Sequence, residues 1–125
     1  MFGLKNGSRA ETQLETMIGN GSSFQGTLRS QALVRIDGRM EGGLSADGVI
    51  VGDNGEIQGD ISARTVVVGG KVCGNIHASE TLELLKQAQV FGDLISPRLL
   101  IAEGAVFEGK CVMSEEKSRL IEVNG

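Results

Sequence analysis

Few residues in this chain could carry out chemistry, and the best candidate is a glycine–lysine motif. Gly104, Gly109 and Lys110 have the spacing of a phosphate-binding loop, in which backbone amides and a lysine hold the phosphates. That loop requires Ser or Thr directly after the lysine and then a helix, whereas Cys111 stands there. Gly109 also belongs to a repeat described below. We therefore predict a turn at this place and no bound nucleotide.

The other candidate residues lack partners in the sequence. His77 is the only histidine, and one histidine cannot build a multi-histidine metal site within a subunit. Cys73 and Cys111 have no metal-binding or redox spacing and suit a reducing cytosol. No serine, aspartate or glutamate suggests a nucleophile with its base. We predict no enzymatic activity, no metal and no cofactor.

The composition excludes further classes. The net charge is -4 and aromatic residues make up 3% of the chain, so a nucleic-acid partner with basic and stacking surfaces is not expected. No apolar run has the length of a signal sequence or of a transmembrane helix. These features predict a cytoplasmic protein. Its core must be built from aliphatic side chains, because Trp and Tyr are absent.

An internal repeat dominates the sequence, and glycines mark it. The anchoring glycines follow one another at intervals of 15–18 residues: Gly26, Gly42, Gly59, Gly74, Gly92 and Gly109. Two residues before each lies an apolar residue: Phe24, Met40, Ile57, Val72, Val90 and Phe107. Two residues after each lies another: Leu28, Leu44, Ile61, Ile76, Leu94 and Cys111. A second alternating pair follows: Val34/Ile36, Val49/Val51, Val66/Val68, Leu82/Leu84 and Leu99/Ile101.

Period-2 alternation between glycine turns indicates short strands. A repeat of this length is too short for a strand and a crossover helix, but it fits one coil of a solenoid. Stacking the coils at about 4.8 Å turns the apolar positions into continuous inward columns. The sequence predicts an all-β, single-stranded parallel β-helix of about six coils over residues 21–113. Residues 1–20 and 114–125 are predicted to be flexible tails.

The stretches IDGRMEGGLSADGVIVGDNGEIQGDISARTVVVGGKVCGNIHA and LLIAEGAVFEGKC resemble the bactofilins, a family of bacterial cytoskeletal scaffolds. The resemblance covers roughly residues 20–113. It implies a right-handed β-helix that assembles without nucleotide into non-polar filaments at the cytoplasmic face of the membrane. It also implies a role in placing cell-wall enzymes and shaping cells.

The resemblance also suggests roles for particular residues. The N-terminal MFGLK, with Met1, Phe2, Leu4 and Lys5, is similar to the family's membrane-targeting motif. Phe107 matches a phenylalanine of the last coil that supports polymerisation in the family.

A β-helix exposes an open strand edge and a section of core at each end. The two phenylalanines among the apolar positions of the repeat lie in the terminal coils. We therefore predict a polymerisation interface of Phe24, Leu28, Phe107 and Met113. The alternative is that the tails fold over the ends, using Leu14, Ile18, Leu120 and Ile121. Cys73 and Phe91, on neighbouring coils and directed outward, are candidates for a lateral contact patch.

Two other function classes use β-helices. A hexapeptide-repeat enzyme, such as an acyltransferase or a γ-type carbonic anhydrase, needs an unbroken six-residue period, and the carbonic anhydrase also needs several histidines. An ice-binding solenoid needs an aligned threonine column. Repeat lengths of 15–18 residues, one histidine and scattered threonines disfavour both.

Overall fold

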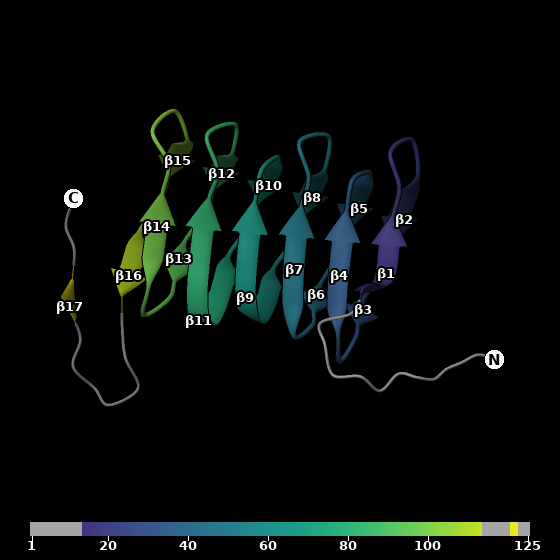
Figure 1. The fold of residues 1–125 in the computed structure, drawn as a ribbon, viewed down its shortest axis with the longest axis horizontal. Helices are drawn as coiled ribbons and strands as arrows, with labels where there is room; N and C mark the ends of the chain where they lie inside the picture. Colours follow the sequence, from purple (N-terminus) through teal and green to yellow (C-terminus); the bar gives the residue numbers. More distant parts are fainter. Residues whose placement is uncertain (1–13, 114–120, 123–125) are drawn as a thin grey trace.

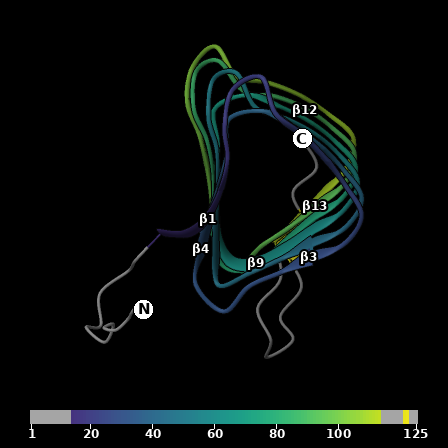
Figure 2. The same ribbon diagram turned by 90° about the vertical axis from the view of Figure 1, so that its right-hand side faces the viewer.

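The chain forms a right-handed solenoid. The structure, a computed structural model, describes residues 14–113 and 121–122, and these residues form strands and no helix. The coils stack along one axis (Figure 1). Seen from the N-terminal end, the chain circles clockwise as it recedes from the viewer (Figure 2). The predicted parallel β-helix of about six coils is confirmed.

Each coil has three sides, which we call faces one, two and three. Face one contains β2 (Ser23–Gln25), β5 (Arg39–Glu41), β8 (Glu56–Gln58), β10 (Lys71–Cys73), β12 (Gln89–Phe91) and β15 (Val106–Glu108). Face two contains β3 (Leu28–Arg29), β6 (Leu44–Ser45), the first parts of β9 (Ile61–Val68) and β11 (Ile76–Leu84), β13 (Leu94–Ile95) and β16 (Cys111–Met113). Face three contains β1 (Leu14–Ile18), β4 (Leu33–Ile36), β7 (Gly48–Val51), the second parts of β9 and β11, and β14 (Leu99–Ile101).

The strands of successive coils pair in parallel, and their register matches the predicted columns. Met40 pairs with Ile57, and Ile57 with Val72, on face one. On face three Val49 pairs with Val66, and Val66 with Leu82. The large inward side chains of the central coils are at most 2% exposed on all three faces. Each such side chain contributes about 1.5–3 kcal/mol on burial, so neighbouring coils stabilise one another.

The corner between faces one and two consists of glycines that no other residue can replace. Gly59, Gly74 and Gly92 have φ between 148° and 149°, a region that L side chains rarely adopt. A Cβ on Gly74 would also overlap the carbonyl oxygen of Gly59, one coil earlier. A Cβ on Gly92 would overlap Gly74 in the same way. From Gly42 onward the repeat glycines are therefore a steric requirement of close stacking.

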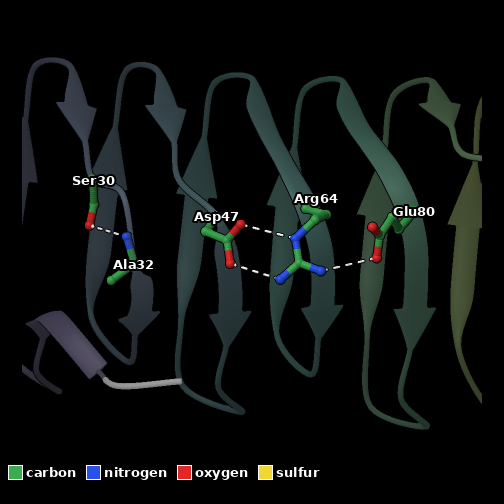
Figure 3. A network of polar contacts seen from close by, with 5 residues as sticks. All are labelled: Ser30, Ala32, Asp47, Arg64 and Glu80. Carbon is green, nitrogen blue, oxygen red and sulfur yellow. Dashed lines mark hydrogen bonds and ion pairs between the residues drawn. The ribbon is translucent and has the colours of Figure 1, made fainter. Parts of the chain in front are cut away.

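An ion-pair network joins three coils on the outer surface (Figure 3). Arg64 donates to both carboxylate oxygens of Asp47, at 3.0 and 2.9 Å, and to Glu80 Oε1 at 3.1 Å. The hydrogen bonds from Arg64 hold the pKa of Asp47 below its usual value. The three side chains are about half exposed, so water screens the network and it adds little to stability.

The solenoid extends further toward the N-terminus than the repeat predicted. β1 pairs in parallel with β4, although residues 14–18 belong to the segment 1–20 that was expected to be a tail. β1 is the last side of a coil that has no preceding glycine anchor, so the repeat pattern could not detect it. At the other terminus β17 (Ile121–Glu122) pairs antiparallel with β16. The predicted flexibility of 1–13, 114–120 and 123–125 concerns residues outside the described ranges.

We predict that Gly74→Ala strongly destabilises the solenoid, whereas Gly43→Ala does not. Gly74 combines a φ of 148° with the carbonyl of Gly59 at the place of the new Cβ. We expect a loss of about 3 kcal/mol or more from strain and displaced backbone. A Cβ on Gly43 meets no atom within 4 Å, so its variant should stay within about 0.5 kcal/mol of the parent. Urea denaturation measures both, and equal stabilities would contradict the steric account.

Candidate functional site: the open ends of the solenoid

The C-terminal end leaves inward columns unfinished. Ile101 follows Leu84 in one inward column of face three, but Leu84 is 0% exposed and Ile101 is 49% exposed. On face one Phe107 follows the fully buried Val90 and is only half-buried. These side chains point inward, as core residues do. In the described part of the chain, however, no further coil packs on top of them. The end of the rod is therefore an apolar surface.

The strand edges at the C-terminal end are also open in part. Within residues 14–113 and 121–122, β14 pairs only with β11 and β15 only with β12. β16 differs, because β13 lies on one side of it and β17 on the other. Faces one and three thus present unpaired backbone groups, which are templates for a further strand.

The N-terminal end is arranged similarly. Among the residues that the structure describes, β1, β2 and β3 each pair with a strand on one side only. Phe24 and Leu28 are half-buried and pack against the core, while Ile18 is 8% exposed. The two open ends lie at opposite extremes of the rod (Figure 1).

The predicted interface residues fall at these two ends. Phe24 and Phe107 occupy the same inward column of face one, at its first and last positions. Leu28 begins the inward column of face two, and Cys111 ends it. Met113 lies in β16, with its side chain outside the described residues.

The alternative in which the tails cover the ends has partial support. Residues 14–18 complete face three at the N-terminal end, and β17 covers the β16 edge at the other. The sequence analysis did not assign Ile101 to the interface. Its place in the last alternating pair, Leu99/Ile101, was the available signal.

Comparisons with known proteins identify the family. The family model of the bactofilins, described as polymer-forming cytoskeletal, matches residues 16–112. The chain belongs to the bactofilin family. It is 33% identical over 107 residues to Bactofilin BacP of Myxococcus xanthus (strain DK1622), covering 84% of this chain and 45% of BacP. It is 34% identical over 106 residues to Bactofilin BacO of the same organism, covering 84% of each chain.

The chain thus spans less than half of BacP and most of BacO. No solved structure matches it significantly. Bactofilins are polymer-forming cytoskeletal proteins, so the family assignment supports a structural scaffold that associates with itself. It also argues against the hexapeptide-enzyme alternative, because that class is catalytic.

The phosphate-loop spacing has a structural explanation in this bactofilin. Gly109 has a φ of 147° at the glycine corner, and the strand β16 begins two residues later, at Cys111. The backbone N–H of Lys110 donates to Asp93 Oδ1 at 3.2 Å, so it is engaged within the solenoid. The motif is the corner of a coil. His77 is exposed on face two, and within the described ranges no three His, Cys, Asp or Glu side chains are grouped so as to hold a metal ion.

Cys73 and Phe91 are stacked on adjacent coils, as their shared position in the repeat predicted. They are register partners in β10 and β12 of face one, and both are half-buried. Their use as a lateral contact stays a prediction. The membrane-targeting candidates Met1, Phe2, Leu4 and Lys5 lie outside the described residues. The part of the chain that the structure describes contains no helix long and apolar enough to cross a membrane.

Cys111 offers a probe of the C-terminal end. Burial raises the pKa of its thiol, so at pH 7 to 8 less of the reactive thiolate forms than in an unfolded chain. We predict that a Cys73→Ser variant, with Cys111 as its one cysteine, reacts slowly with iodoacetamide when folded. The rate should fall several-fold further on assembly, because the end becomes covered.

The matched control is Cys111→Ser, which retains Cys73 on face one, away from the ends. Its alkylation rate should change little on assembly. Mass spectrometry of timed samples measures both rates. Cys111 labelling that is as fast in assembled as in unassembled protein would contradict a covered C-terminal end.

Proposed function

We propose that this bactofilin is a scaffold whose subunits join end to end, without nucleotide, into non-polar filaments. The observation that carries the proposal is the unfinished core at both ends of the rod. Inward columns that are fully buried in the middle end in half-covered side chains, including Phe24 and Phe107. A second rod placed on either end supplies the missing layer.

The energetics favour such contacts. Covering a side chain such as Ile101, now 49% exposed, gains roughly 1 kcal/mol. Each backbone hydrogen bond made by an open edge adds about 0.5–1.5 kcal/mol. These gains come from burial and strand pairing alone, so the assembly needs no hydrolysis cycle.

A filament without polarity results if each rod end contacts the same end of the next rod. Because Phe24 and Phe107 hold the same column at opposite ends, two N-terminal ends bring together two rings, and so do two C-terminal ends. Alternating contacts of these two kinds give a filament whose directions are equivalent.

We further propose that the filaments lie at the cytoplasmic face of the membrane and organise cell-wall or cell-shape machinery. Support comes from the similarity of the MFGLK segment to the membrane motif of the family. One such peptide binds weakly, but a filament carries many copies and increases the overall affinity.

We predict that Phe107→Arg abolishes filaments. The arginine would lie unpaired in a dry contact, at a cost of about 3 kcal/mol or more. That cost raises the protein concentration needed for assembly at least about 100-fold. Phe91→Arg is the matched control, because Phe91 lies one coil earlier and faces outward. It should leave filaments intact, while loss of bundles alone would indicate the Cys73–Phe91 lateral patch.

Electron microscopy in buffer without nucleotide or metal provides the readout, and circular dichroism confirms that both variants are folded. Abundant filaments from a folded Phe107→Arg protein would contradict the end contact.

We also predict that deleting residues 2–9 removes binding to anionic lipid. The deletion takes away Phe2, Leu4 and Lys5 and leaves the solenoid from residue 14 onward intact. Flotation with phosphatidylglycerol vesicles separates lipid-bound filaments from free ones. A deletion of 114–125 serves as the control and should still float. Undiminished flotation of the 2–9 deletion would show that the lipid contact lies elsewhere.

A further inference from the structure

The outward surface of face three carries one column that runs the whole length of the rod. Register partners in successive coils define it: Met17, Arg35, Ile50, Val67, Glu83 and Leu100. We call it the face-three column. Its positions are spaced about 4.8 Å apart, so it is roughly 25 Å long.

This column is more apolar than an outward position in a solenoid needs to be. Four of its six members are apolar: Met17, Ile50, Val67 and Leu100. Met17 and Leu100, at the two ends of the column, are 53% and 48% exposed. Ile50 and Val67 at its centre are half-buried, and the neighbouring Gly52 and Gly69 are buried beside the side chains of Asp37, Asp53 and Leu85. A column of this kind is suited to contact with another surface.

The order of charges along the column is self-complementary. From either end it reads apolar, charged, apolar, apolar, charged, apolar, and reversing the direction exchanges Arg35 with Glu83. A two-fold axis between Ile50 and Val67 therefore places Arg35 of one copy opposite Glu83 of an antiparallel copy. It also places Met17 opposite Leu100. A parallel copy would instead bring like charges together, which is unfavourable.

The two charged side chains are suited to such a contact. Glu83 is half-buried between Val67 and Leu100, and its carboxylate has no ion-pair partner among the described residues. Arg35 donates from Nε to Asp37 Oδ2 at 2.8 Å. That bond orients the guanidinium, which also feels the charge of the nearby Asp53 carboxylate. The Arg35 side chain is 41% exposed, so its terminal nitrogens can still donate to a carboxylate of another copy.

We propose that face three is an antiparallel, two-fold docking surface for a second copy of this chain, held by the apolar members of the face-three column and by two reciprocal Arg35–Glu83 pairs. The face covers only roughly 300 Å², about 25 Å by about 13 Å, whereas a stable interface buries about 800 Å² per partner. Two single rods therefore bind each other weakly, whereas two filaments bind through many copies of the contact. Stable side-by-side association thus rests on the proposed filament.

Charge reversal tests the pairing. Arg35→Glu and Glu83→Arg are each assembled into filaments separately. We expect each to form single, unpaired filaments, because two carboxylates or two guanidinium groups then meet across the two-fold axis. Mixing the two sets of preformed filaments should restore pairing, since each set then meets the opposite charge. Lys71→Glu, an exposed charge reversal on face one, is the matched control and should pair as the parent does.

Low-speed sedimentation and electron microscopy measure side-by-side association. Loss in both single variants and recovery in the mixture supports the proposal. Parent filaments that never pair, single variants that still pair, or a mixture that stays unpaired would overturn it. These results are separate from filament formation, which the end contact governs.

A second measurement works even where no filament forms. In the variant Arg35→Lys, a carbodiimide joins the new amine directly to a carboxylate that touches it. Within one chain positions 35 and 83 are three coils apart, about 14 Å, so a link between position 35 and Glu83 must join two copies. We expect this link at high protein concentration in low salt. It should largely disappear in about 1 M NaCl, which screens the ion pair. Absence of the link at low salt would overturn the proposal.

Discussion

The glycine corner is the constraint on which the rest of the structure depends. At each successive coil the carbonyl oxygen of one corner glycine lies where the next glycine would carry its Cβ, as in the pair Gly59 and Gly74. Only glycine permits that approach, and the approach brings successive coils within strand-pairing distance. Once the corner is fixed, the residues two positions before and after it must point inward. The apolar columns follow from this one contact.

A structure built by repetition completes its core in the middle and leaves it incomplete at the ends. Val90 is fully buried because Phe107 covers it, yet in the described part of the chain no further coil covers Phe107. The same repetition makes each outward position a column, so a few residues such as Arg35 and Glu83 define the character of a whole face. End contacts and lateral contacts are therefore separate properties, set by inward and outward positions respectively.

The sequence predicted the inward columns well because they are tied to the glycines by fixed short spacings. It missed β1, which belongs to a coil without a glycine anchor. It also missed the face-three column and the Arg64 network. Corner lengths vary between coils, with spacings of 15–18 residues, so outward residues far from the glycines align only when the register is known. The predicted interface residues Phe24 and Phe107 were found because each lies two positions before an anchoring glycine of the repeat. The exposure of Ile101 required the structure.

X-ray fibre diffraction from aligned filaments tests the end-to-end arrangement most directly. If rods join at their ends, the solenoid axis runs along the filament and the strands lie across it. The spacing of paired strands, about 4.8 Å, should then appear as a strong reflection on the meridian. Filaments built by side-by-side packing of rods would place that reflection on the equator, and this result would contradict the account.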